Sequence, residues 1–125
     1  MNDTARFWAA AGALNAFLAV AAGAFGAHGL RARVTDRLLA VFETGARYHM
    51  FHALGLVAVA WLASQRGPAA NPAGVAMLAG IALFSGSLYA MTLTGITRLG
   101  IITPLGGVAF LAGWLLFARA AWQAG

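Results

Sequence analysis

Residues 73–93 read AGVAMLAGIALFSGSLYAMTL and contain no Asp, Glu, Lys, Arg or His. An α-helix needs about 20 apolar residues to cross the roughly 30 Å hydrocarbon core of a bilayer. A run of this length without a charge is therefore typical of a transmembrane helix. Small residues recur in it at intervals of three and four, as they do where membrane helices approach one another closely.

Three further apolar stretches extend on either side of this one. With residues 73–93, they give four expected spans: 7–27, 48–64, 73–93 and 101–121. The stretch QRGPAANP at 65–72 holds one Gly, two Pro and one Asn, a composition typical of a turn. The sequence therefore predicts an all-α fold, an integral membrane four-helix bundle that forms one transmembrane domain over residues 1–125.

The aromatic residues are consistent with an even number of crossings. Trp8, Trp61 and Trp122 fall on one predicted side of the membrane, and Tyr48 and Tyr89 fall on the other. Trp and Tyr are enriched at both membrane interfaces. Both chain ends are therefore expected on the same side.

The connection between the first two expected spans carries most of the charges. Residues 28–47 hold Arg31, Arg33, Asp36, Arg37, Glu43 and Arg47 among apolar side chains. Thr35 or Asp36 could cap a helix start there. We expect an amphipathic helix that lies at the membrane interface and runs into the second span.

Helical projection gives each span a face of small or polar residues, which we expect to form the helix contacts. The four faces are Gly12, Asn15, Ala19, Ala22 and Gly26; Gly45, Tyr48, His49, His52 and Gly55; Ala79, Ala82, Gly86 and Ala90; and Gly106, Ala109, Gly113 and Ala120. Gly86 and Gly113 are accordingly predicted to lie in close contacts between helices.

Composition excludes several classes of protein. Of the 125 residues, 62% are hydrophobic and 9% are charged, whereas soluble domains are about half apolar and about a quarter charged. The absence of cysteine excludes disulfides and thiolate metal sites. The net charge of +5 comes from arginines scattered at the ends of apolar stretches, without a basic stripe, so no nucleic-acid partner is expected.

The arginines also predict an orientation. The side that holds both chain ends has Arg6, Arg66 and Arg119, and the other side has Arg31, Arg33, Arg37, Arg47 and Arg98. Cytoplasmic loops carry an excess of Lys and Arg. The segments 28–47 and 94–100 are therefore predicted to face the cytoplasm.

Three histidines are the candidate functional residues. His28 ends the first expected span, and His49 and His52 open the second, so all three rings are expected near one membrane face. With Tyr48 they are the candidates for binding a metal, a haem, a quinone or a proton. The favoured interpretation is that the imidazoles hydrogen-bond within the bundle, with His52 bonded to another span, and no cofactor is predicted.

The remaining polar residues offer no catalytic set. No carboxylate lies at mid-span, which weighs against proton-coupled transport. Ser85 and Ser87 have no base beside them in the sequence, so we expect them, with Asn15 and Thr92, to hydrogen-bond between helices. This favours a non-enzymatic protein. We expect a structural or accessory subunit, or a lipid-binding bundle, and the alternative is a redox or ligand-binding membrane protein that uses the histidines.

The chain resembles a known family through four motifs. These are GAFGAHGL at 23–30, YHMFHALGL at 48–56, FSGSLY at 84–89 and TPLGG at 103–107. They are similar to the small membrane-protein family called domain of unknown function 423, which includes bacterial YgdD-type and vertebrate transmembrane protein 256-like members. The resemblance implies a multi-pass protein of the bacterial inner membrane, surrounded by lipid, and implies no activity. A homo-oligomer or a larger membrane complex stays open.

Overall fold

The computed structural model describes residues 1–123, in which every regular element is a helix. The elements are α1 Asp3–Phe25, η1 Gly26–Leu30, α2 Asp36–Arg66, η2 Gly67–Ala70, α3 Asn71–Gly80, η3 Ile81–Ser85, α4 Gly86–Thr94, η4 Thr97–Ile101 and α5 Thr103–Trp122. The elements η1 and η3 are π-helical turns, and η2 and η4 are 3-10 turns. The all-α expectation is therefore confirmed.

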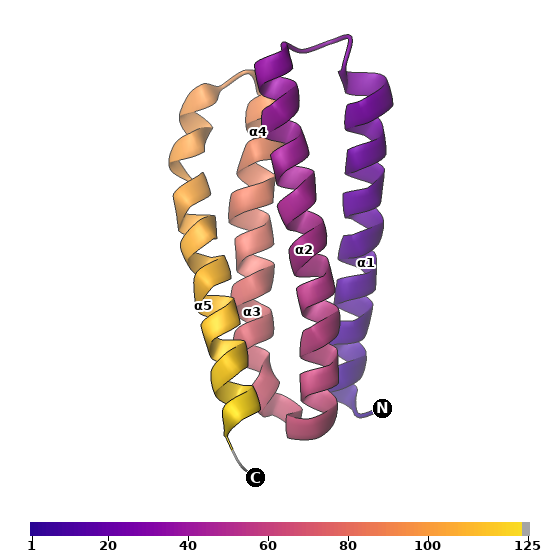
Figure 1. Ribbon diagram of the computed structural model, residues 1–125, viewed down its shortest axis with the longest axis vertical. Coiled ribbons are helices and arrows are strands. Elements are labelled where there is room, and N and C mark those ends of the chain that lie inside the picture. Colours follow the sequence, from indigo (N-terminus) through magenta and orange to yellow (C-terminus); the bar gives the residue numbers. More distant parts are fainter. Residues whose placement is uncertain (124–125) are drawn as a thin grey trace.

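Within the described residues, three continuous helical stretches are long and apolar enough to cross a membrane: Asp3–Leu30, Asp36–Thr94 and Thr97–Trp122. This count differs from the four separate spans expected, because η2 joins α2 to α3 without a non-helical break. A straight helix of 59 residues would be about 88 Å long. The stretch instead reverses at Gly67, whose positive φ of 55° suits glycine, so α2 and α3 run antiparallel (Figure 1).

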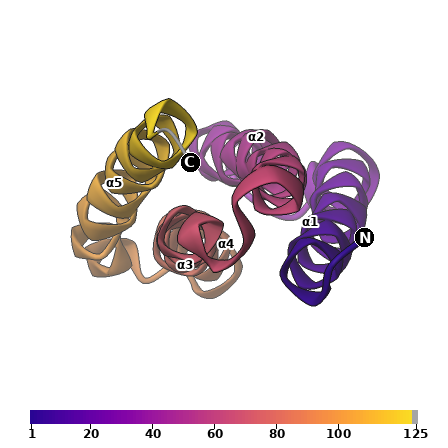
Figure 2. The same ribbon diagram turned by 90° about the horizontal axis from the view of Figure 1, so that it is seen from below.

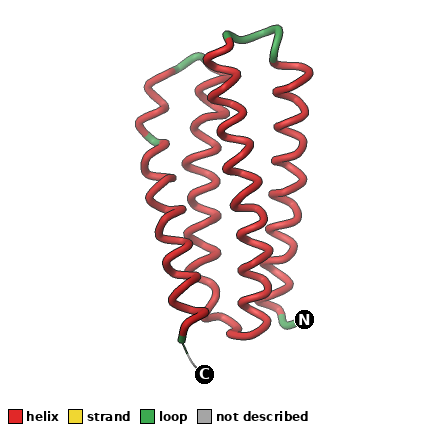
Figure 3. Tube along the Cα trace, in the orientation of Figure 1, coloured by secondary structure: helices red, strands yellow, loops and turns green. Residues whose placement is uncertain are grey.

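The π-turns continue the helices that they interrupt. The residues on either side of η3, Gly80 and Gly86, keep right-handed helical dihedrals, so α3, η3 and α4 form one rod (Figure 3). In that rod the Ser85 hydroxyl donates to the Gly45 carbonyl of α2 at 2.7 Å. The reversal at η2 therefore leaves two long antiparallel rods that are tied by a polar contact.

Viewed along the helices, the bundle is unevenly closed (Figure 2). The α1 helix packs mainly on α2, and α5 packs mainly on α3, while α2 also contacts α4 and η3. Extended packing of α1 against α3 or α4 is not found among the described residues. An open side therefore remains between α1 and the α3–α4 rod.

The charged segment after the first span belongs to α2 and is not a separate interfacial helix. Thr35 caps α2, because its hydroxyl accepts from the Leu38 amide at 3.2 Å. Leu39 and Phe42 are buried against Leu30, which closes one end of the bundle. The expected helix that runs into the second span is thus present from Asp36 onward, because these apolar residues continue the buried face of α2 without interruption.

Glycines set the closest helix contacts. A Cβ at Gly12 would lie 2.9 Å from the Val57 amide nitrogen and 3.0 Å from the Ala53 carbonyl oxygen of α2. A Cβ at Gly113 would lie 2.8 Å from Met77 Cγ, and one at Gly106 would overlap the backbone of Phe84. These distances are shorter than real Cβ atoms tolerate, so the helices approach as closely as they do because side chains are absent.

The predicted contact face of the third span is wrong. Ala79 and Ala82 are exposed, and a Cβ at Gly86 would meet only the Ile81 carbonyl oxygen at 3.9 Å. The α3–α4 rod instead buries the neighbouring positions Ala73, Gly74, Met77, Gly80 and Ile81. Small residues at helical spacing identified a smooth face, but larger Met77 and Ile81 fill the core better than alanine.

Replacing Gly113 by Leu should destabilise the bundle by about 1–3 kcal/mol or more, since the side chain would overlap Met77. Gly86→Leu is the matched control and should unfold at the same temperature as the unchanged protein or higher, because it gains helix propensity without a clash. Thermal unfolding in detergent, followed by circular dichroism, measures both. Equal loss of stability in the two variants would contradict the assignment of these two faces.

Candidate functional site

His49 lies at the centre of a hydrogen-bonded chain through three helices. Its Nδ1 is 3.0 Å from the Tyr89 hydroxyl of α4, and its Nε2 is 2.9 Å from Asn15 Oδ1 of α1. The Asn15 amide nitrogen donates to the Ala11 carbonyl at 2.8 Å, which fixes the amide orientation. Nε2 therefore carries the proton and donates to Asn15, while Nδ1 accepts from Tyr89.

His52 is held in the opposite tautomer. Its Nδ1 is 2.8 Å from the Tyr48 carbonyl oxygen, which only accepts, so Nδ1 carries the proton. Its Nε2 accepts from the Trp114 indole nitrogen of α5 at 3.0 Å. The predicted hydrogen bond from His52 to another span is thereby confirmed. The ring also stacks on Phe110, with centroids 3.5 Å apart and planes within 6°.

The three histidines do not share one level. His52 lies 16 residues into α2, or about 24 Å from its start. Asn15, which bonds His49, lies on α1, and His28 lies 13 residues beyond it on η1. His28 is therefore about 20 Å farther along the continuous helix of α1 and η1. The expected common level is wrong because α2 begins at Asp36, which places His49 and His52 near mid-helix. Within residues 1–123, no group of three His, Cys, Asp or Glu is placed to hold a metal ion.

The other intramembrane polar residues are also paired. Thr92 donates to the Leu38 carbonyl at 3.2 Å, and the hydroxyls of Ser87 and Thr103 are 2.6 Å apart. In the described part of the chain, no buried side-chain nitrogen or oxygen lacks a partner. The expected structural role of Asn15, Ser85, Ser87 and Thr92 is confirmed. A proton relay through His49 has no continuation, because the Asn15 amide does not titrate.

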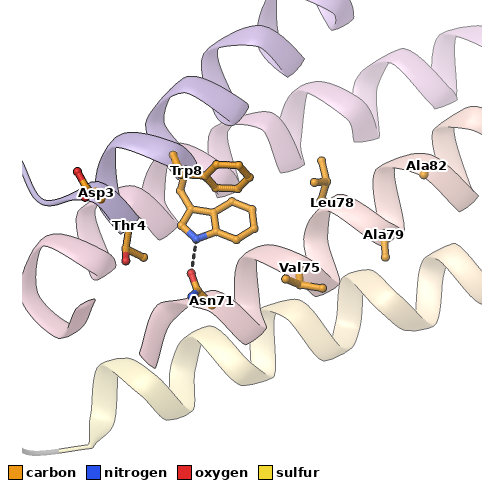
Figure 4. Close-up of a pocket in the computed structure, with 9 residues that line it drawn as sticks. Asp3, Thr4, Trp8, Asn71, Val75, Leu78, Ala79 and Ala82 are labelled. Carbon is orange, nitrogen blue, oxygen red and sulfur yellow. Dashed lines mark hydrogen bonds between the residues drawn. The ribbon is translucent and has the colours of Figure 1, made fainter. Parts of the chain in front are cut away.

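A long groove, which we call the α1–α3 groove, follows the open side of the bundle. Its lower part, near the start of α1, has a volume of about 740 Å³ and lies between Trp8 on α1 and Val75 on α3 (Figure 4). The Trp8 indole donates to Asn71 Oδ1 at 2.8 Å across its end. The remaining lining residues are Asp3, Thr4, Phe7, Leu78, Ala79 and Ala82.

The upper part of the same groove reaches the histidine chain. It measures about 430 Å³ and is lined by Asn15, Leu18, Ala22, His49, Ile81, Ala82, Gly86 and Tyr89. Ala82 lines both parts, so they adjoin. From Asn71 to Tyr89 the groove extends about 27 Å, close to the hydrocarbon thickness of a bilayer. Its walls are mainly apolar, with aliphatic and aromatic side chains, and the Asn15, His49 and Tyr89 side chains that line its upper part are already hydrogen-bonded to one another.

A second groove, the α2–α5 groove, has aromatic walls. It measures about 460 Å³ and is lined by Tyr48, Phe51, His52, Phe84, Gly107, Phe110, Leu111 and Trp114. The rings of Tyr48 and Phe110 are parallel to within 17°. Of the candidates expected from the sequence, Tyr48 and His52 lie here, His49 lies at the α1–α3 groove, and His28 lies at neither.

Sequence reasoning missed two of the partners that hold the imidazoles. Tyr89 was expected at a membrane interface and Trp114 was not singled out, yet each bonds one histidine. Their signal in the sequence was a polar tip on an aromatic ring inside an apolar span, which requires a partner when buried. The identity of that partner depends on which helices lie side by side.

The family assignment rests on sequence comparison. A family model described as "Protein of unknown function (DUF423)" matches residues 22–107. The chain belongs to this DUF423 family. The matched region begins near the end of α1 and covers the histidine sites, both rods of the central reversal and the first turns of α5.

The relatives of this DUF423 chain are bacterial membrane proteins. It is 54% identical over 112 residues to the UPF0382 membrane protein YwdK of Bacillus subtilis, covering 88% of this chain and 91% of the relative. It is 46% identical over 112 residues to a UPF0382 membrane protein of Staphylococcus aureus strain bovine RF122, covering 90% and 92%. No solved structure matches it. The expected family is thus confirmed.

Removing the Tyr89 hydroxyl should destabilise the protein by about 0.5–2 kcal/mol, because His49 Nδ1 would lose its donor inside the bundle. Tyr48→Phe is the matched control, since no hydrogen bond to the Tyr48 hydroxyl is found among residues 1–123. Thermal unfolding of Tyr89→Phe and Tyr48→Phe in the same detergent compares them. A larger loss for Tyr48→Phe would contradict the assigned chain.

Proposed function

We propose that this protein is a non-enzymatic, lipid-binding bundle of the bacterial inner membrane that crosses the bilayer four times. The observation that carries the proposal is the α1–α3 groove, which is open along nearly the whole expected membrane thickness. Its mainly apolar walls match phospholipid acyl chains. Its lower end, beside Asp3, Thr4 and Asn71, is polar and matches the headgroup side.

The reversal at Gly67 supports four crossings. The 59-residue stretch is too long for one crossing of a roughly 30 Å core, and its two antiparallel rods are each long enough for one. With α1 and α5 this gives an even number, and the start of α1 and the end of α5 lie at the same end of the bundle (Figure 1). The bacterial relatives are named membrane proteins, which supports a membrane location.

The residues at the base of the α1–α3 groove favour an occupant that forms no hydrogen bonds with the protein. His49 faces the groove but is only 5% exposed, and both of its nitrogens are engaged by Tyr89 and Asn15. No polar group there needs a partner from the occupant. An acyl chain, which supplies none, therefore fits this surface better than a polar solute does.

Two other functions have weaker support. Ala79, Ala82 and Gly86 present a smooth face that a helix of a second copy or of a larger complex could cover, as an accessory subunit would require. Metal, haem or redox binding through the histidines has less support, since His49 and His52 present no free lone pair.

Filling the α1–α3 groove should release lipid. Gly86→Leu adds a side chain into its upper part without a clash and should retain several-fold less phospholipid than the unchanged protein after detergent exchange. Native mass spectrometry counts the retained lipid. Gly23→Leu is the matched control, because a Cβ at Gly23 meets nothing within 4 Å and Gly23 lines neither groove.

The outcomes separate the candidate functions. Reduced lipid in Gly86→Leu alone supports the proposal. Equal lipid in all three proteins would refute it. Loss of a dimer or of a stoichiometric protein partner in Gly86→Leu, with lipid unchanged, would replace it by the accessory-subunit interpretation.

The arginine distribution yields a topology test. Five arginines on the side opposite the chain ends, against three on the other, predict that η1, the following loop and η4 face the cytoplasm. Alkaline phosphatase fused after Gly125 should therefore be active, because it would lie outside the cytoplasm. Green fluorescent protein fused at the same position and exported through the Sec pathway should not fluoresce. Fluorescence with inactive phosphatase would reverse the orientation.

A further inference from the structure

The α2–α5 groove differs from the α1–α3 groove in the shape of ligand that it suits. The rings of Tyr48, His52 and Phe110 share one orientation, with pairwise angles between planes of 6°, 13° and 17°. Phe51, Phe84 and Trp114 complete the walls. Because His52 and Phe110 cover each other's faces and are only 4% and 5% exposed, a ligand meets the rings of Tyr48, Phe51 and Trp114. Exposed aromatic rings attract a flat ring by offset stacking or edge contact.

The Tyr48 hydroxyl supplies a free hydrogen-bond donor at this groove. The Tyr48 side chain is 38% exposed, and no partner for its hydroxyl is found among the described residues. An unpaired phenol at the edge of a mainly apolar groove gains from a ligand that carries an acceptor oxygen.

Gly107 keeps the groove open. A Cβ at Gly107 would meet nothing within 4 Å, although a Cβ at the adjacent Gly106 would overlap the Phe84 backbone. Glycine inside a helix costs about 1 kcal/mol relative to alanine. At Gly106 the close packing of α5 on Phe84 offsets this cost. At Gly107 no such contact is found among residues 1–123. The space above Gly107 is therefore available to a ligand.

We propose that the α2–α5 groove binds a lipid-soluble molecule of the quinone class, whose flat ring stacks on the aromatic wall and whose carbonyl oxygen accepts from the Tyr48 hydroxyl. Its alkyl tail lies in the bilayer beside exposed Phe51 and Leu111. This site is separate from the α1–α3 groove and does not depend on the lipid-binding function. It is also different from ligation by the histidines.

His52 acts as a positioning residue at this site. Its Nε2 holds the Trp114 indole at 3.0 Å, and its ring is stacked on Phe110. The histidine is 4% exposed, so its edge is not offered to the ligand. Tyr48 and Trp114, on α2 and α5, form the accessible surface that His52 keeps in place.

Quenching of Trp114 fluorescence tests the proposal directly. The reference protein carries Trp61→Phe and Trp122→Phe, which remove two exposed tryptophans and leave Trp114 and the distant, buried Trp8. It is placed in phosphatidylcholine nanodiscs and titrated with a short-chain ubiquinone. Saturable quenching is expected, and phospholipid is already present in excess as a competitor.

Three variants of this reference locate the site. Gly107→Leu should weaken ubiquinone binding at least tenfold, and Tyr48→Phe should weaken it about threefold to tenfold, as expected for one hydrogen bond. Gly86→Leu, which fills the other groove, should bind like the reference. Circular dichroism and thermal unfolding confirm that Gly107→Leu is folded, as the empty space around its Cβ predicts.

Each result decides the proposal. Saturable quenching that is lost in Gly107→Leu and weakened in Tyr48→Phe supports the site. Quenching that rises linearly with quinone, or that is equal in Gly107→Leu and the reference, would overturn it. Equal weakening by Gly86→Leu would also overturn it, and the lipid-retention result for Gly86→Leu stands independently of either outcome.

Discussion

The need to pair polar side chains inside an apolar bundle is the constraint on which the rest of the structure depends. The chain from Tyr89 through His49 to Asn15 ties α4, α2 and α1 at one level. A shift of α1 by one turn, about 5.4 Å, would break the bond between His49 Nε2 and Asn15 Oδ1. Such a loss costs about 1–3 kcal/mol for each buried group. These bonds therefore favour one register of α1 on α2, and the close contact of Gly12 with α2 requires the same register.

Glycines then decide how the helices lie around that fixed register. Gly12 brings α1 onto the backbone of α2, and Gly106 and Gly113 bring α5 onto the α3–α4 rod. Because these close contacts pull α1 and α5 toward different neighbours, the bundle is left open on two sides. The grooves are thus a consequence of the tightest packing in the molecule. Glycines with free space around them, Gly86 and Gly107, lie in those grooves.

The two grooves give this DUF423 protein two surfaces of different chemistry within the span of a bilayer. One is long, mixed aliphatic and aromatic, with Asn15, His49 and Tyr89 bonded to one another. The other is short and aromatic, and no partner for its Tyr48 hydroxyl is found among residues 1–123. The histidines contribute to both as fixed parts of the wall, in opposite tautomers. In both proposed functions, the ligand would reach the bundle from the surrounding bilayer through one of these side walls.

The sequence by itself determined the helical class, the apolar lengths, the turn at 65–72 and the family, because hydrophobic runs and turn residues act locally. It also indicated that His52 would bond to another span, since a buried imidazole requires partners. Only the tertiary structure decided which partners these were and that Ala79, Ala82 and Gly86 face away from the core. Helical periodicity describes a single helix, and small residues suit either a packed face or an open groove. The choice between them depends on where neighbouring helices lie, which is fixed by contacts between residues far apart in the chain.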